Sequence, residues 1–234
     1  MRFTALFIVA SLVGSATAHM ALLYPTPRGG YGTRQYNGHV HTFIGYKDQK
    51  WNARFPCGGF GPGPVTKLSA NQVVPVRFAA SSMNANELKN QPSPSARHQF
   101  PQARHGGGTC EFSLSYDGGN SYHLIGQYTK SCPDAYYEWP IRIPKNVPSC
   151  TKRNQCLFVW SWVANILPQY YHNCADVEIR GLSSGGKLPS KGIQIVDFSG
   201  HKMGVKAPGD GAGEHMGKGP SRNEVVANLE GTWN

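Results

Sequence analysis

The sequence predicts an all-β protein, an immunoglobulin/fibronectin-like antiparallel β-sandwich with long loops. The 234 residues include 28 Gly and 17 Pro, a turn-rich composition, and only 15% are charged, which is too few for a disordered chain. Several short runs alternate apolar and polar residues with a period of two, as half-buried antiparallel strands do. No stretch of twelve or more residues has a convincing helical pattern.

The chain begins with a segment typical of a secretory signal peptide. Arg2 precedes an apolar run over residues 5–13, and Ala16-Thr17-Ala18 has the small-x-small pattern of a cleavage site. A membrane anchor is the disfavoured alternative, because the run is shorter than the ~20 residues that span a bilayer and no second run follows. We therefore expect residues 1–18 to be removed and the mature protein to be secreted and extracellular, with no membrane contact.

The next residues divide into an irregular region and a series of strands. Residues 20–64 have little periodicity and many Gly, Pro and aromatic residues, which predicts long loops with short strands. Six strand-like runs are found at residues 73–78, 110–116, 122–128, 139–143, 156–163 and 174–180. Asp117-Gly118-Gly119-Asn120 separates the second run from the third and predicts a hairpin. In the fifth run, Phe158, Trp160 and Trp162 share one face and apolar residues fill the other, which predicts a central strand.

Beyond Arg180 the composition shifts toward Gly, Lys and Ser, with one more apolar run at residues 193–196 and a short helix-like stretch at 224–229. We expect residues 19–180 to form the sandwich domain and residues 181–234 to form a Gly/Lys-rich extension that packs on it or is partly flexible. Residues 210–213, Asp-Gly-Ala-Gly, lack the flanking strand and helix and the GK[ST] ending of a phosphate loop.

The six cysteines predict three disulfides in an oxidising compartment, and the sequence alone allows fifteen pairings. We expect the pairings Cys150–Cys156, Cys110–Cys132 and Cys57–Cys174. The first pair flanks a short basic turn and the second bounds a hairpin, which leaves the third. That third bond would close the longest loop and tie the N-terminal region to the last predicted strand.

Three residues stand out, and the first of them could bind a metal ion. Cleavage after Ala18 would make His19 the first residue, where an α-amine and an imidazole can bind one ion. A second imidazole is provided by His105, in His105-Gly-Gly-Gly-Thr-Cys110, whose glycines let the backbone turn sharply before a strand. The third residue is Tyr171, in Tyr171-His-Asn-Cys-Ala175, which leads into the strand that starts at residue 174. Nitrogen donors of this kind suit Cu(II), which stands highest in the Irving–Williams order.

These motifs resemble those of a known family. His19-Met20, Phe55-Pro-Cys57, the His105 motif, Phe158-Val-Trp-Ser-Trp162 and the Tyr171 motif look like the fungal lytic polysaccharide monooxygenases of auxiliary activity family 11, which are copper enzymes acting on chitin. The resemblance covers roughly residues 19 to 180, in the same order. It implies a histidine brace, in which His19 and His105 bind copper and Tyr171 occupies a weak axial position.

The resemblance also implies an activity, the oxidative cleavage of glycosidic bonds at C1 or C4. The partners that it implies are a polysaccharide, chitin or another wall polymer, together with an external electron donor and O2 or H2O2. We expect a monomer whose catalytic residues are His19, His105, Tyr171 and Gln169. The family commonly has Glu where this chain has Gln169, and a glutamine can donate and accept hydrogen bonds but cannot act as a general acid or base. A second hypothesis therefore stays open, a non-catalytic copper- or polysaccharide-binding protein of the same fold.

Neighbouring residues offer alternatives to two of these assignments. Tyr170 could replace Tyr171 in the axial position, whereas His172 alternates with Tyr171 and should point to the opposite face. His98 lies in a Pro/Ser/Gln-rich loop and could compete with His105.

Two further histidines suggest a second metal site. His39 and His41 would share a strand face, but this site would lack a third ligand.

The basic character of the chain raises the question of nucleic-acid binding. The formal net charge is +10, and the loss of Arg2 with the signal peptide removes one unit. Secretion, and basic residues that are spread along the chain instead of forming a run, argue against a nucleic-acid partner. On a wall polymer, a positive charge favours neutral or acidic chains over deacetylated chitosan, within a screening length of ~8 Å.

Overall fold

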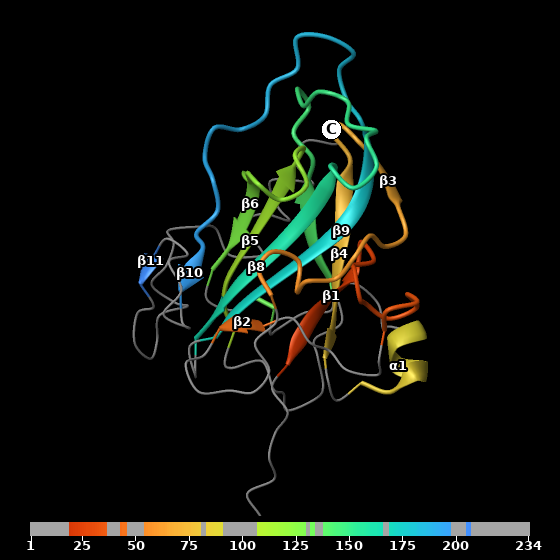
Figure 1. Cartoon of the computed structure of the whole chain (residues 1–234), viewed down its shortest axis with the longest axis vertical. Helices are drawn as coiled ribbons and strands as arrows, with labels where there is room; N and C mark the ends of the chain where they lie inside the picture. Colours follow the sequence, from red (N-terminus) through yellow and green to blue (C-terminus); the bar gives the residue numbers. More distant parts are fainter. Residues whose placement is uncertain are drawn as a thin grey trace, which may run out of the picture.

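In the computed structural model of the chain, the described residues are 19–36, 43–45, 54–80, 83–90, 107–129, 132–133, 138–165, 169–197 and 205–206. They form two packed β-sheets, a short parallel strand pair and one five-residue helix (Figure 1). The β-sandwich predicted from the sequence is therefore confirmed. The stretches 210–213 and 224–229 lie outside the described residues.

The smaller sheet is antiparallel and has the order β1-β4-β7. Its strands are β1 (Met20–Tyr24), β4 (Val73–Ala80) and β7 (Glu138–Arg142). The larger sheet has the order β2-β9-β8-β5-β6, and β3 runs parallel to the second half of β9. Its strands are β2 (Phe43–Gly45), β3 (Thr66–Ser69), β5 (Gly108–Ser115), β6 (His123–Tyr128), β8 (Leu157–Ala164) and β9 (Tyr170–Arg180).

Two further strands and a helix lie outside the sheets. The parallel pair is β10 (Val196–Asp197) with β11 (Val205–Lys206). Helix α1 (Ala85–Lys89) begins with a capping box, in which the side chains of Asn84 and Glu87 each accept from the other residue's backbone N–H. Among the described residues, no helix is long and apolar enough to span a membrane.

The six strand-like runs of the sequence correspond to β4–β9. The Asp117 turn joins β5 to β6 as predicted, and its carboxylate accepts the backbone N–H groups of Asn120 and Ser121. Strand β8 lies between β5 and β9, and all eight of its residues are buried, which confirms its central position. The irregular region after His19 contains two short strands, of which β1 belongs to the smaller sheet and β2 to the larger one.

The main core lies between the two sheets. Apolar side chains from β1, β4 and β7 pack there against Phe112, Trp160, Trp162 and Tyr171 of the larger sheet. The ring of Phe78 in β4 lies 4.8 Å from that of Trp160, so aromatic contacts connect the two sheets. Each large apolar side chain that is fully buried contributes ~1.5–3 kcal/mol, so this core is the main source of stability.

A second, smaller cluster covers the outer face of the larger sheet. It is centred on Leu157, Val159 and Cys174, against which the partly buried Ile193 and Ile195 pack. Ile193 and Ile195 of the apolar run predicted at residues 193–196 therefore lie against the sheet. The division of the chain at residue 180 stays a prediction.

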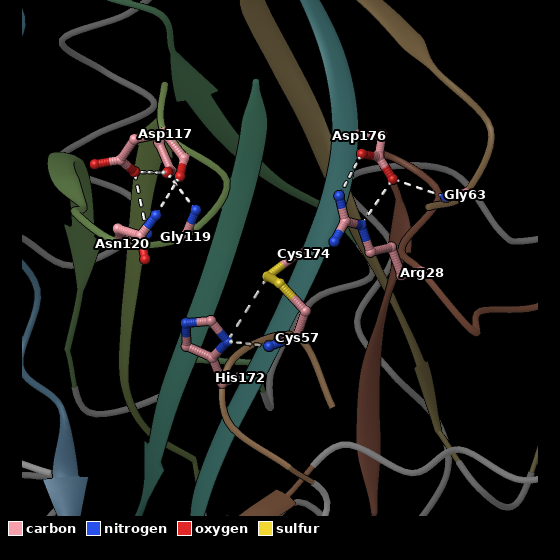
Figure 2. Close-up of a disulfide and its surroundings, with 10 residues drawn as sticks. Arg28, Cys57, Gly63, Asp117, Gly119, Asn120, His172, Cys174 and Asp176 are labelled. Carbon is pink, nitrogen blue, oxygen red and sulfur yellow. Dashed lines mark hydrogen bonds and ion pairs between the residues drawn. A yellow bond between two sulfur atoms is a disulfide. The ribbon is translucent and has the colours of Figure 1, made fainter. Parts of the chain in front are cut away.

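All three disulfides have the predicted pairing. The bonds are Cys57–Cys174, Cys110–Cys132 and Cys150–Cys156, and no described cysteine is unpaired. The first spans 117 positions of sequence and fastens the loop after Phe55 to the middle of β9 (Figure 2).

Candidate metal centre

Tyr171 lies on the inner face of β9, near the start of the strand. Its side chain is fully buried, and its ring is 4.5 Å from that of Trp162, the residue opposite it on β8. Its hydroxyl donates to Oε1 of Gln169 at 2.6 Å. Burial raises the pKa of Tyr171 well above its usual value, so the side chain is a neutral phenol at ordinary pH. The hydroxyl hydrogen points to Gln169, so the lone pairs of the phenol oxygen stay available.

Gln169 connects the end of β8 to the start of β9. Its carbonyl accepts the backbone N–H of Ala164 at 3.0 Å, and its side chain is buried, with 5% of the residue exposed. Because the Gln169 backbone is hydrogen-bonded and its side-chain amide is buried, the amide has few possible orientations. The Tyr171 hydroxyl therefore donates to an acceptor whose position is fixed.

His19 directly precedes β1 and is half-buried. The following residue, Met20, is buried and pairs with Ala80 of β4, so His19 is attached to the sheet without an intervening loop. Burial lowers the pKa of His19, which favours the neutral imidazole, the form that binds a metal ion.

A buried side chain connects the strand that follows His19 to the strand that carries Tyr171. The backbone N–H of Leu22 donates to Oδ1 of Asn173 at 2.7 Å, and Asn173 is 1% exposed. Asn173 is two residues after Tyr171, so both side chains are on the inner face of β9. Figure 1 shows β1 and β9 beginning at the same, lower end of the sandwich. The strand that follows His19 and the strand that carries Tyr171 are therefore joined by the Leu22–Asn173 hydrogen bond.

His105 lies outside the described residues, as do His39, His41 and His98. The strand that follows His105 begins at Gly108, opposite Ala164 at the end of β8, and the carbonyl of Gly107 accepts the N–H of Asn165 at 2.9 Å. A Cβ atom at Gly108, whose φ is +144°, would lie 2.1 Å from the carbonyl oxygen of Val163. Only glycine fits there, and the close approach expected of the glycine run is found.

Alternation along β9 separates Tyr171 from its two neighbours. Tyr170 and His172 are buried on the outer face, so Tyr171 is the tyrosine that faces β1. Nδ1 of His172 accepts the backbone N–H of Cys57 at 3.3 Å, beside the Cys57–Cys174 disulfide (Figure 2). Burial lowers the pKa of His172 to about 3, so this histidine is a neutral packing residue on the face opposite Tyr171, as expected.

Asn173 and Trp162 were not among the predicted site residues. The sequence holds a signal for Asn173, since it is an amide among Tyr171, Ala175, Val177 and Ile179 on an otherwise apolar strand face. A polar residue on such a face needs a partner, and here that partner is the backbone of β1. The part of the chain that the structure describes contains no group of three or more His, Cys, Asp or Glu side chains that could hold a metal ion. The assignment of His19, His105, Tyr171 and Gln169 stays a prediction.

Comparison with known proteins bears on the family. The chain is 40% identical, over 81 residues, to the AA11 family lytic polysaccharide monooxygenase A of Aspergillus fumigatus, and the match covers 34% of each protein. Over this third of its length, the chain is similar to an AA11 lytic polysaccharide monooxygenase. This confirms the resemblance stated from the motifs, although the match spans only about a third of the length of the AA11 protein.

The chain was also compared with protein-family models and with solved structures. No protein-family model matches the chain. Among solved structures, the extended catalytic domain of H. jecorina LPMO9A, also called EG4, is similar with a TM-score of 0.30 and 12% identity, covering 67% of this chain and 66% of that one. At this TM-score, the similarity to LPMO9A says nothing about the site of this chain.

Proposed function

We propose that this protein is a secreted copper-dependent lytic polysaccharide monooxygenase that oxidatively cleaves glycosidic bonds in chitin. The similarity to an AA11 enzyme supports the reaction class. In this chain, the proposal is supported above all by the Leu22–Asn173 hydrogen bond. This bond holds the strand that directly follows His19 against the strand that contains Tyr171. The protein acts outside the cell as a monomer, with no nucleic-acid or membrane partner.

The donor groups suit copper. The amine and imidazole of His19 and the imidazole of His105 would supply three nitrogen donors, and the phenol of Tyr171 a weak oxygen donor. Nitrogen donors favour Cu(II), whereas structural zinc usually takes four protein ligands. The described side chains fit this role, because the Tyr171 hydroxyl donates its hydrogen bond to Gln169 and its oxygen keeps its lone pairs. The α-amine has a reference pKa of ~7.7–8.0, so it can lose its proton to a metal at modest cost.

The chain's own residues position these donors. Bound copper would supply the one-electron chemistry by which O2 or H2O2, with electrons from an external donor, oxidises a glycosidic C–H bond. Trp162 packs against the Tyr171 ring and fixes its plane. Gln169 orients the hydroxyl, and it has no titratable group with which to transfer a proton.

A second candidate is a non-catalytic copper- or polysaccharide-binding protein with the same fold. Gln169 favours it, because a glutamine near the metal cannot serve as the general acid or base that a glutamate could. Incubation with chitin, ascorbate and peroxide separates the two. Oligosaccharides oxidised at C1 (aldonic acids) or at C4, detected by mass spectrometry, support the enzyme, and the absence of both across several polysaccharides supports the binding protein.

The brace assignment has a direct test. A variant with one additional Met before His19 should lose most of its Cu(II) affinity, because the α-amine of His19 becomes part of a peptide bond. The matched control is the same chain beginning at His19, with the N-terminal mass of each protein verified. Equal copper affinities for the two proteins would show that the amine is no ligand.

A further inference from the structure

A cleft of about 610 Å³ lies between three surface segments. Its walls are residues 32–35, residues 62–64 and Arg153. The backbone N–H of Gly63 donates a hydrogen bond to Asp176 of β9. Asp176 is five residues after Tyr171 in the same strand, so at ~3.3 Å per residue the two residues are ~16 Å apart. The cleft is therefore separate from the proposed copper site.

The charge of the cleft is positive. Arg34 and Arg153 are both exposed and are its charged lining residues, and no acidic residue lines it. Among the described residues, the ion pairs are Arg28–Asp176 and Arg77–Glu138, so neither cleft arginine is neutralised by one. Two arginines that have no carboxylate partner among the described residues thus line one concave space.

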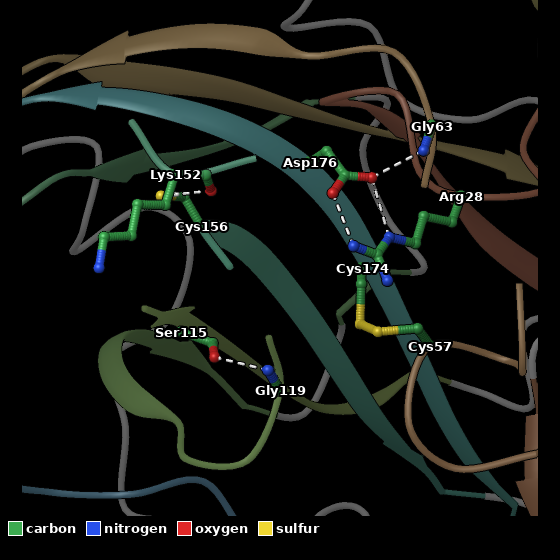
Figure 3. A network of polar contacts seen from close by, with 9 residues as sticks. All are labelled: Arg28, Cys57, Gly63, Ser115, Gly119, Lys152, Cys156, Cys174 and Asp176. Carbon is green, nitrogen blue, oxygen red and sulfur yellow. Dashed lines mark hydrogen bonds and ion pairs between the residues drawn. A yellow bond between two sulfur atoms is a disulfide. The ribbon is translucent and has the colours of Figure 1, made fainter. Parts of the chain in front are cut away.

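The wall formed by residues 62–64 is held by a buried ion pair. Arg28 binds Asp176 through Nε and Nη2 at 2.8 and 2.6 Å, and Oδ2 of Asp176 also accepts the N–H of Gly63 at 2.7 Å (Figure 3). The backbone N–H of Arg28 donates to the carbonyl of Cys174 at 2.8 Å. Both carboxylate oxygens of Asp176 are bonded to Arg28 or Gly63. Asp176 therefore holds the wall in place, and its negative charge is paired with Arg28 and not with Arg34 or Arg153.

The other two walls are also fixed by backbone hydrogen bonds, one wall to a neighbouring hairpin and the other within its own turns. Arg153 projects from the turn closed by the Cys150–Cys156 disulfide, and this turn is tied to the β5–β6 hairpin by the bond from Gly118 N–H to the carbonyl of Gln155, at 3.0 Å. The wall of Arg34 is a pair of consecutive turns, closed by N–H bonds from Thr33 to Gly30 and from Tyr36 to Thr33. Anchored walls lower the entropic cost of ligand binding.

The ligand class follows from these features. A guanidinium fork matches the two oxygens of a carboxylate and binds them with paired hydrogen bonds. The volume is in the ~300–1,000 Å³ range of small-molecule sites, so an inorganic ion would fill only a part of it. Thr33 and Gln35 add donors and acceptors suited to hydroxyl groups. We propose that this cleft binds a carboxylate-bearing saccharide, such as a short uronic-acid oligomer.

The proposal is tested with trigalacturonic acid, by calorimetry on the full secreted chain in EDTA, so that copper and the proposed reaction have no influence. Arg34→Gln and Arg153→Gln should each weaken binding by about tenfold, the loss expected for a charge-assisted hydrogen bond, and the double variant should show no binding. Arg180→Gln is the matched control, since it removes the same charge from an exposed position outside the cleft. It should change the affinity by less than about twofold, because Arg180 does not line the cleft and its exposed charge acts there only through screening solvent.

Other outcomes would overturn the proposal. These are unchanged binding in the double variant, an equal loss in Arg180→Gln, equal affinity for a neutral trisaccharide, or equal affinity for inorganic sulfate, which would indicate an ion site. Amide chemical-shift changes on titration should map to residues 32–35, Gly63 and Arg153, and changes confined to the Tyr171 end would also overturn it.

Discussion

Asn173 shows how one buried amide can link two distant parts of this chain. Its Oδ1 accepts the Leu22 N–H, which is 151 positions away in sequence. The strand pattern predicts that Asn173 faces inward, but its partner is determined by the packing of one sheet on the other. The sequence thus predicts Tyr171 and Gln169 as candidates but does not predict Asn173, whose hydrogen bond joins β9 to the strand after His19.

We expect Asn173→Ala to destabilise the protein by about 1–3 kcal/mol, because the buried Leu22 N–H loses its acceptor. If the proposed copper site is correct, Cu(II) affinity should also fall, since β1 is less firmly held. Urea unfolding and a Cu(II) titration measure the two effects. Asn173→Asp keeps an oxygen acceptor and should restore most of the copper affinity; an equal loss in both variants would exclude this role for the hydrogen bond.

Glu111 is a second buried polar residue with a measurable consequence. It is 4% exposed, and its Oε2 accepts the Gln194 N–H at 2.6 Å. Burial raises its pKa from 4.5 to about 6, so the folded protein holds this proton more tightly than the unfolded chain does. The resulting stabilisation is complete below pH 4.5 and is lost as the pH rises through 6, at about 1.4 kcal/mol per pKa unit, or about 2 kcal/mol in all.

Glu111→Gln keeps an acceptor for Gln194 but cannot titrate. The free energy of unfolding of the variant should therefore decline less than that of the parent protein between pH 4.5 and 7.5, by about 2 kcal/mol. Denaturant unfolding at both pH values measures the difference. Parallel pH profiles for the two proteins would contradict the raised pKa.

At the level of elements, the strands with alternating residues could be predicted from the sequence, and the short ones could not. Strands β4–β9 follow the expected runs because one face of each is repeatedly apolar. In contrast, β1 (Met-Ala-Leu-Leu-Tyr) has no polar alternation, and β3 exists because it pairs in parallel with β9. Helix α1 is a single short turn stabilised by its capping box, which is too short for a periodic pattern.

The disulfides differ in the length of chain that they close. Cys57–Cys174 spans 117 positions and Cys150–Cys156 only 6. In the loop-entropy model, the long closure stabilises by about 4–5 kcal/mol and the short one by about half as much. Replacing both cysteines of each pair by Ala should reproduce this order in denaturant unfolding. An equal loss from the two replacements would show that chain entropy does not dominate here.

For the whole molecule, copper binding should appear as added stability. A ligand that binds only the folded state stabilises it by about 2.7 kcal/mol at one hundred times its Kd. Cu(II) should therefore raise the melting temperature of the protein that begins at His19, and EDTA should reverse the rise. The variant with an additional Met before His19 should show little change. The same rise in both proteins would argue against a ligand at the chain end.

The residues after Arg180 determine where this protein can be shortened. Ile193 and Ile195 cover Leu157, Val159 and the Cys57–Cys174 bond, and Gln194 binds Glu111. A chain ended at Arg180, where the composition changes, would keep every strand of both sheets while leaving apolar and carboxylate groups of the larger sheet open to water. Exposed apolar sheet surface promotes association between molecules. For recombinant work, the shortest soluble form therefore extends at least to Ile195, and a polydisperse product from the shorter chain would be the sign of its missing cover.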